Sequence, residues 1–193
     1  MTISPMNISE DKQRLRREAE SVRYSLAHST PGAAAAITQS FFNGISIASG
    51  VIVAGYVPTR SEADPLPLME GLRTVGHPLA LARVAEKDRS LHFHLWRDNE
   101  APVKSAFSMM EAAPDWPSII PDVLLIPLLG FDKNGYRLGY GGGFYDRSLH
   151  SLRMRASVLA VGIAFAGQEM VLPHDEHDER LNWIVTEKYS WQV

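Results

Sequence analysis

The segment RLGYGGGFYDR, residues 137–147, has the residue types and spacing that suit the binding of a phosphate group. Glycines let a backbone approach an anion closely with its N–H groups, and a helix that starts directly after them adds the positive end of its dipole. Arg137 and Arg147 flank the glycines and can pair bidentately with phosphate oxygens. Asp146 stands where a carboxylate can hold a Mg²⁺ ion that bridges those oxygens. We therefore interpret this segment as a phosphate- or nucleotide-binding turn.

Two common phosphate-binding motifs do not describe this segment. No Gly-Lys-Ser/Thr sequence follows the glycines, so it is not a Walker A loop, and the spacing from Gly139 and Gly141 reaches Phe144 where the Rossmann fingerprint needs glycine. The alternative interpretation is a tight turn that only joins a strand to a helix. We favour a ligand, because four glycines in five positions weaken any regular element.

Strand and helix patterns alternate along the chain. Short apolar runs or alternating patterns predict strands at 51–57, 78–84, 91–96, 123–129, 157–166 and 184–188. Capping and helical spacing predict helices that start at the N-cap Ser9, at 33–42, at 66–75, and from the glycines through Met154. We therefore expect a single open three-layer α/β/α domain over residues 1–193, with a mostly parallel sheet, helices on both faces and frayed residues 1–7.

The first helix has two faces of different character. Leu15, Ala19, Val22 and Leu26 recur at helical spacing and predict the buried stripe. The other face carries the basic residues Lys12, Arg14, Arg16 and Arg17. Taken alone, such a run is typical of a solvated helix face.

Two groups of acidic side chains follow predicted strands, one after the strand at 51–57 and one after the strand at 157–166. Glu62 and Asp64 come just after the strand at 51–57, and ligands of α/β sheets gather at the carboxyl ends of strands. An exposed acidic turn is the alternative. His174, Asp175, His177 and Asp178 also cluster, but their spacing matches no strong zinc pattern, so we assign no metal site to them.

Composition excludes several classes of function. The net charge of −3 gives no broad basic surface for nucleic acid. The absence of cysteine removes disulfides and thiolate catalysis and fits a cytoplasmic protein. We also expect no secretory signal and no membrane association, because the N-terminus lacks an apolar core region and no apolar run approaches spanning length.

The segment 122–147 resembles the signature of the 5-formyltetrahydrofolate cyclo-ligases, also called methenyltetrahydrofolate synthetases. In that family, Pro-x-x-x-Phe-Asp leads into Gly-x-Arg-Leu-Gly-x-Gly-x-Gly-Tyr/Phe-Tyr-Asp. The matching positions here are Pro127, Phe131, Asp132, Gly135, Arg137, Leu138, Gly139, Gly141, Gly143, Phe144, Tyr145 and Asp146. Weaker blocks resemble the family in the same order, namely 12–16, 62–64, 107–111 and 173–187, so the resemblance spans nearly the whole chain.

The chain departs from the family pattern at four positions. Ser108 and Ala112 replace the Gly and Pro of one block, and Gly142 stands where some members have Lys. Asn182 stands where some members have a second Mg²⁺-ligating Asp, and an Asn carbonyl can ligate Mg²⁺ without supplying charge.

The resemblance implies an ATP- and Mg²⁺-dependent enzyme that cyclises 5-formyltetrahydrofolate, free or polyglutamylated, to 5,10-methenyltetrahydrofolate. It implies catalytic roles for Arg137, Tyr145 and Asp146, and metal ligation by Asp146 and Asn182. The implied ATP-binding residues are Lys12, Gln13, Arg14, Leu15, Arg16, Arg137, Leu138, Gly139, Tyr140, Gly141, Gly142, Gly143, Phe144 and Tyr145. The implied folate-binding residues are Thr59, Glu62, Asp64, Tyr140, Gly141, Gly142, Gly143 and Phe144. We expect a monomer or weak homodimer. A non-catalytic folate- or nucleotide-binding module, and a ligase or transferase for another pterin-like substrate, are the alternatives.

Overall fold

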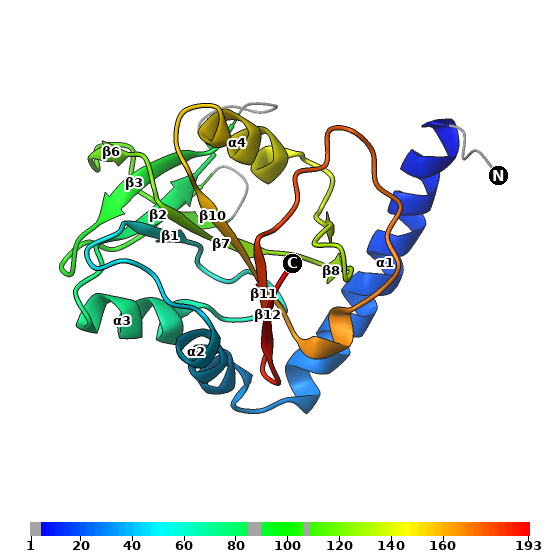
Figure 1. Cartoon of the computed structure of the whole chain (residues 1–193), viewed down its shortest axis with the longest axis horizontal. Coiled ribbons are helices and arrows are strands. Elements are labelled where there is room, and N and C mark those ends of the chain that lie inside the picture. The colour runs from blue at the N-terminus through cyan, green and yellow to red at the C-terminus, as the bar shows by residue number, and fades with distance from the viewer. Residues whose placement is uncertain (1–4, 85–89, 106–108) are drawn as a thin grey trace.

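An eight-stranded mixed sheet runs through the computed structural model, which describes residues 5–84, 90–105 and 109–193 (Figure 1). The strand order is β12-β11-β10-β7-β1-β2-β3-β6. The five strands from β11 to β2 pair in parallel, whereas β12 at one edge and β3 and β6 at the other side of the sheet pair antiparallel with their neighbours. The strands are β1 (Val53–Gly55), β2 (Leu79–Arg83), β3 (His92–Trp96), β6 (Ser118–Ile119), β7 (Val123–Pro127), β10 (Leu159–Ile163), β11 (Trp183–Val185) and β12 (Ser190–Gln192).

The central strand β7 is buried on both faces, as its apolar sequence predicts. Successive side chains of a strand point to opposite faces, so a strand covered on both sides needs apolar residues at every position. Leu125 packs into the core on one face of the sheet, while Leu124 and Ile126 pack into the core on the other. Because β7 lies inside the sheet with strands on both sides, its carboxyl end lies near the middle of the row formed by the ends of the strands.

Helices cover both faces of the sheet, which confirms the expected three layers (Figure 1). On one face, α2 (Ala33–Gly44) and α3 (Leu66–Thr74) bury Phe41 and Leu68 against the strands. On the other face, α4 (Phe144–Arg153) buries Leu149 and Leu152. The remaining helices are α1 (Pro5–Ser29) and the short 3₁₀ helix η1 (Ala166–Gln168).

A small hairpin connects the long helix α1 to the sheet. Strands β8 (Gly130–Phe131) and β9 (Arg137–Leu138) pair antiparallel directly after β7, and the glycine-rich turn follows β9. Ala19 of α1 packs with Leu129 and Leu138 in a separate apolar cluster. The helix therefore lies beside the glycine-rich turn. A second small pair joins β4 (Val103–Lys104) to β5 (Met110–Glu111).

The structure corrects several details of the predicted elements. The first helix begins at Pro5, before the expected N-cap Ser9. Val22 does not belong to the buried stripe of α1, because its side chain is 46% exposed, whereas the neighbouring Arg23 is completely buried. Most strands are shorter than their apolar runs, and β12 has no counterpart in the prediction. None of the helices in the described ranges is both long enough and apolar enough to cross a membrane.

We expect Leu125→Ala to lower the free energy of unfolding by about 2–5 kcal/mol, because it opens a cavity beneath the central strand. Urea unfolding followed by circular dichroism measures the change. Val171→Ala is the matched control: its side chain is 90% exposed, so we expect a change within about 0.5 kcal/mol. Equal losses for the two variants would contradict the assignment of this core.

Candidate active site

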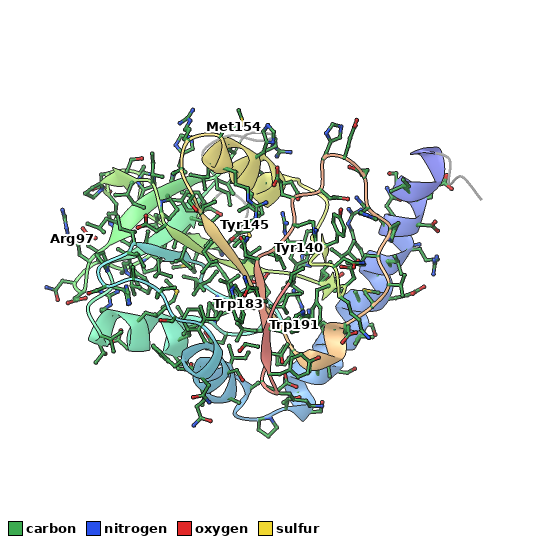
Figure 2. All side chains as sticks on the ribbon, viewed as in Figure 1. Arg97, Tyr140, Tyr145, Met154, Trp183 and Trp191 are labelled. Atoms are coloured by element: carbon green, nitrogen blue, oxygen red, sulfur yellow. The ribbon has the colours of Figure 1, made fainter. Side chains whose placement is uncertain are left out.

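A cleft with a volume of about 1490 Å³ opens at the carboxyl ends of β1, β7 and β2. The loop after β1 supplies Thr59 and Glu62, and α1 supplies Lys12 and Arg16. The glycine-rich turn, the start of α4 and the loop 175–179 complete the walls. Tyr140 of the turn and Tyr145 of α4 are labelled in Figure 2. Ligand sites of open α/β sheets form at this edge, so the predicted phosphate turn stands where the fold favours binding.

The glycine-rich turn presents its backbone to this cleft. Gly141 has φ of 93° and Gly143 has φ of 64°, which are left-handed conformations that other residues adopt only with strain. Gly143 is the N-cap of α4, and no side chain caps the helix. The first backbone N–H groups of α4 are thus available to an anion in the cleft. The turn has the geometry of a phosphate cradle.

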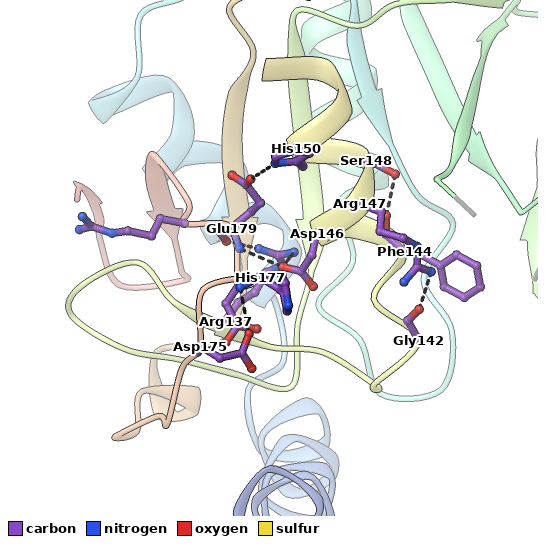
Figure 3. Close-up of polar contacts among 12 residues, drawn as sticks. Arg137, Gly142, Phe144, Asp146, Arg147, Ser148, His150, Asp175, His177 and Glu179 are labelled. Carbon is purple, nitrogen blue, oxygen red and sulfur yellow. Dashed lines mark hydrogen bonds and ion pairs between the residues drawn. The ribbon is translucent and has the colours of Figure 1, made fainter. Parts of the chain in front are cut away.

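Arg137 and Asp146 form an ion pair at the base of the cleft (Figure 3). Nη2 of Arg137 lies 2.7 Å from Oδ1 of Asp146, and Nη1 donates to the carbonyl of Glu179 at 2.5 Å. The backbone N–H of Glu179 donates to the same Asp146 oxygen at 3.1 Å. These bonds join β9, the first turn of α4 and the loop 175–179. Within the described ranges, Oδ2 of Asp146 accepts no hydrogen bond, and the side chain is 30% exposed.

The basic residues of α1 divide between the cleft and the solvent. Nζ of Lys12 lies 3.0 Å from Asp175 and 2.5 Å from Asp178, and Nε of Arg16 donates to the carbonyl of Gly139 at 2.9 Å. Burial alone would lower the pKa of Lys12, but the hydrogen bonds to the two carboxylates raise it, so the ammonium group stays charged. Burial lowers the pKa of Arg16.

Three residues predicted to contact ATP lie away from the cleft. Gln13 and Arg14 are exposed, and Arg14 pairs with Glu18 at 3.1 Å on the outer face of α1. Leu15 packs against the apolar cluster around Ala19. The structure thus brings only Lys12 and Arg16 of this block to the turn.

The two acidic residues after β1 have different environments. Glu62 lines the cleft and accepts a hydrogen bond from the backbone N–H of Thr59 at 2.8 Å. Burial raises the pKa of its carboxyl group, although the Thr59 bond and the charge of Arg23 act in the opposite direction. Asp64 instead accepts a hydrogen bond from the N–H of Leu66 at 2.9 Å, at the start of α3. Asp64 does not line the cleft.

Asn182 is also separated from the cleft. Its Oδ1 accepts hydrogen bonds from the backbone N–H of Ala160 at 2.8 Å and from Arg153 at 3.2 Å. The carboxamide therefore connects β10 to the segment before β11. Among the described residues, no group of three or more His, Asp or Glu side chains is arranged to hold a metal ion. Phe107 and Ser108 of the resembling block lie outside the described residues.

Sequence reasoning missed several residues of the cleft and its wall. Tyr56 directly follows β1 and is buried, with its hydroxyl donating to the carbonyl of Ala63 at 2.6 Å. Glu111 lines the opposite wall and pairs with Arg83 at 2.9 Å. Arg23 lies behind Glu62, and a signal for it was present, because positions 12, 16, 19 and 23 fall on one face of a helix.

Burial raises the pKa of Tyr145 above its ordinary value, so this phenol stays protonated at neutral pH.

We expect Gly141→Ala to weaken ATP binding by about tenfold, the loss typical of one charged hydrogen bond. An added Cβ would lie 3.1 Å from Cζ of Arg16, a tight contact that would shift that guanidinium relative to the turn. Isothermal titration calorimetry measures the affinity. Gly50→Ala is the control, because Gly50 has φ of 75° and no atom within 4 Å of an added Cβ. It carries the same backbone strain of about 1–2 kcal/mol at a site far from Arg16 in the sequence. Equal ATP affinities for the two variants would refute the assigned role of the turn.

The chain is similar to known proteins over most of its length. The model of the 5-formyltetrahydrofolate cyclo-ligase family matches residues 8–187. The 5-formyltetrahydrofolate cyclo-ligase of Mycolicibacterium smegmatis is 31% identical over 191 residues, covering 92% of this chain and 94% of that protein. The enzyme of the same name from Escherichia coli K12 is 31% identical over 153 residues, covering 72% of this chain and 80% of that protein.

Two solved structures have a similar fold. The 5,10-methenyltetrahydrofolate synthetase of Mycoplasma pneumoniae matches with a TM-score of 0.69 and 25% identity, covering 92% of this chain and 99% of that chain. The 5,10-methenyltetrahydrofolate synthetase of Aquifex aeolicus matches with a TM-score of 0.75 and 24% identity, covering 94% and 92%. With the family model matched over most of its length, the chain belongs to the 5-formyltetrahydrofolate cyclo-ligase family.

Proposed function

We propose that the protein catalyses the ATP-dependent cyclisation of 5-formyltetrahydrofolate to 5,10-methenyltetrahydrofolate, with release of ADP and phosphate, in this cleft. The observation that carries the proposal is that one cavity is lined by the glycine-rich turn, the Arg137–Asp146 pair and Glu62. A nucleotide and a folate must meet for this reaction. The whole chain would act as one domain, as a monomer or weak homodimer.

The chemistry explains why both substrates must share a cavity. The carbonyl carbon of a formamide is a poor electrophile. Transfer of the γ-phosphoryl group of ATP to the formyl oxygen turns that oxygen into a leaving group. The neighbouring folate amine, N10, then attacks the formyl carbon, the ring closes, and phosphate leaves. The protein contributes the alignment of the two substrates and the stabilisation of developing negative charge, and no covalent nucleophile is needed.

Cationic groups and backbone N–H groups of the cleft suit the phosphate end of this arrangement. We assign Lys12, Arg16 and Arg137 to the ATP phosphates, together with the backbone of residues 139–143. Arg137 is nearly fully buried, with 4% of its side chain exposed, so its charge acts in a medium where it is poorly screened. Tyr145 would contact the nucleotide. Tyr140, Phe144 and Glu62 would position the folate, with the carboxylate of Glu62 accepting hydrogen bonds from pterin N–H groups.

Asp146 has the donor chemistry that a Mg²⁺ ion requires. Mg²⁺ prefers oxygen ligands and commonly binds through one carboxylate, phosphate oxygens and water. Oδ2 of Asp146 is the oxygen that the pairing with Arg137 leaves over, next to the phosphate turn. Mg²⁺ held there would neutralise phosphate charge. Because the carboxamide of Asn182 is engaged outside the cleft, we assign the metal to Asp146 alone.

We expect purified protein to form the methenyl product only when 5-formyltetrahydrofolate, ATP and Mg²⁺ are all present, with one ADP released per product. Near-ultraviolet absorbance follows the product, and a coupled assay follows ADP. Absence of product with both substrates bound in calorimetry would favour a non-catalytic binding module. ATP turnover that needs a different pterin-like substrate would favour another ligase or transferase.

We expect Asp146→Asn to raise the Mg²⁺ concentration that half-activates the enzyme by about tenfold or more, because the amide keeps the shape but removes the charge from the metal ligand. The measurement is initial rate against Mg²⁺ at saturating ATP and folate. Asp115→Asn, at an exposed position outside the cleft, should leave the Mg²⁺ dependence unchanged. If the two variants respond alike, Asp146 is not the metal ligand.

A further inference from the structure

Arg23 of α1 is a completely buried cation that does not itself line the cleft. Its Nε donates to Oγ of Ser61 at 3.2 Å, and its Nη1 donates to the carbonyl of Leu128 at 3.4 Å. Nη2 donates to the hydroxyl of Tyr140, and Nη1 lies 3.9 Å from Oε1 of Glu62. The guanidinium thus stands directly behind two residues that face the cleft.

Packing alone does not account for an arginine at this position. Removal of a guanidinium from water is costly, and an apolar side chain of similar size commonly stabilises a buried contact equally well or better. The neighbouring positions on this face of α1 already supply apolar packing through Ala19 and Leu26. The buried charge therefore indicates that the polar groups between Arg23 and the cleft, those of Glu62 and Tyr140, need a cation beside them.

The contacts of Arg23 connect two segments that line the cleft. Glu62 belongs to the loop after β1, whereas Tyr140 belongs to the glycine-rich turn, far away in the sequence. A guanidinium is a planar fork with donors in fixed directions, so its hydrogen bonds to Ser61, the residue before Glu62, and to Tyr140 hold the two segments in a defined relative orientation, with the Glu62 carboxylate 3.9 Å from the same cation. The Tyr140 ring also lies against this cation, with Cζ of Arg23 at 5.4 Å from the ring centroid.

The loop after β1 has internal hydrogen bonds, from the Thr59 N–H to Glu62 at 2.8 Å and from the Tyr56 hydroxyl to the carbonyl of Ala63 at 2.6 Å, but these bonds do not connect it to α1. Arg60 adopts φ of 58°, a left-handed conformation that is unusual for a residue other than glycine. Its guanidinium pairs with Glu20 of α1 at 2.6 Å, but both side chains are largely exposed, and such surface pairs contribute little. The buried contact through Arg23 is the stronger connection between α1 and this loop.

We propose that Arg23 is a positioning residue that fixes Glu62 and Tyr140 relative to each other and so shapes the folate end of the cleft against the nucleotide turn. The proposal rests on the function proposed above, because it assumes that Glu62 and Tyr140 contact the folate. It adds a residue that touches neither substrate and that sets folate affinity through the two that do.

The electrostatics of Glu62 give this role a signature in pH dependence. Burial raises the pKa of the Glu62 carboxyl group, and the charge of Arg23 opposes that effect. The other titratable or charged groups that act on Glu62 come from the loop, the turn and the neighbouring elements, and they are Arg60, Tyr140, Tyr145 and Tyr56. The tyrosines are neutral at physiological pH. Loss of Arg23 should raise the pKa of Glu62 further, so that folate binding is lost at a higher pH as the solution is acidified.

The test compares Arg23→Met, Arg23→Lys and Tyr140→Phe with the wild-type protein. Met keeps the apolar stem without the charge, Lys keeps the charge without the fork, and Phe removes only the hydroxyl that Arg23 contacts. Arg155→Met is the control, because Arg155 is exposed and its side chain makes no hydrogen bond or ion pair with the rest of the described chain, while its backbone N–H donates to the carbonyl of Leu152 in the wild type and the variant alike. For each variant the measurements are KM and kcat for both substrates, the pH profile of kcat/KM for folate, and the melting temperature.

We expect Arg23→Met to raise KM for 5-formyltetrahydrofolate by about tenfold or more, as for a lost hydrogen bond to a charged group, with a change in KM for ATP below about threefold. The acid limb of its pH profile should move to higher pH. Arg23→Lys should restore the pH profile but not the full folate affinity. Tyr140→Phe should weaken folate binding less than Arg23→Met, and the double variant should lose less than the sum of the two, because both changes remove one contact.

Three outcomes would overturn the proposal. The first is Arg23→Met with a lower melting temperature but unchanged folate KM and pH profile, which would make Arg23 purely structural. The second is an equal rise in the KM values for 5-formyltetrahydrofolate and for ATP, with an unshifted pH profile of kcat/KM for folate. The third applies if Arg23→Met does not fold: the proposal then fails when Arg23→Lys and Tyr140→Phe both bind folate as the wild type does. Failure of the proposed function would be distinguishable, because the wild-type protein would then form no product. In that case, calorimetry would measure the affinity of the same variants for 5-formyltetrahydrofolate.

Discussion

The cost of burying positive charge constrains the construction of the cleft. Arg23 is completely buried, and only 4% of the Arg137 side chain is exposed. A guanidinium keeps its proton at physiological pH and carries five N–H donors, so acceptors must converge on it from several directions. Around Arg23 they come from the loop after β1, the end of β7 and the glycine-rich turn; around Arg137 they come from α4 and the loop 175–179. Segments distant in the sequence are thereby held in one arrangement.

The same pairing of charges sets how an anionic ligand can bind. Lys12 is held by Asp175 and Asp178, and Arg137 is held by Asp146, so two of the three cations assigned to the phosphates already have carboxylate partners, whereas Arg16 donates to the carbonyl of Gly139. Phosphate binding at Lys12 would exchange one anionic partner for another, and the net gain is smaller than the attraction between phosphate and lysine. The net charge of −3 provides no long-range attraction that would compensate. In the proposed site, affinity would therefore come largely from Arg16 and from the backbone N–H groups of the turn, which are paired with no carboxylate among the described residues.

The order and type of the main elements could be predicted from the sequence, but their ends could not. The apolar run at 123–129 predicted β7 because a strand covered on both faces needs apolar residues throughout. The run at 51–57 is equally apolar, yet the strand covers only Val53–Gly55. Tyr56 and Val57 leave the sheet and line the cleft, and an apolar composition does not distinguish a strand residue from an apolar wall of a pocket. The short edge strand β12 pairs with β11 through backbone bonds alone, which leave no pattern in the side chains.

The sequence predicted which residues line one cleft where a turn dictates the geometry, but not where the direction of a side chain depends on a helix face or a loop. Residues 137–146 reach the cleft together, because a strand, a glycine turn and a helix start leave the chain few alternatives. In α1 the basic residues cover more than one face, and only those at the spacing of Lys12, Arg16 and Arg23 face the sheet. The apolar residues alone placed Val22 on that face. A charged residue at a buried helical position is invisible to hydrophobic periodicity, yet here that residue stands behind the polar groups that face the cleft. When a basic residue lies on the same helix face as other basic residues that contact a phosphate turn, its spacing predicts the direction of its side chain better than its polarity does.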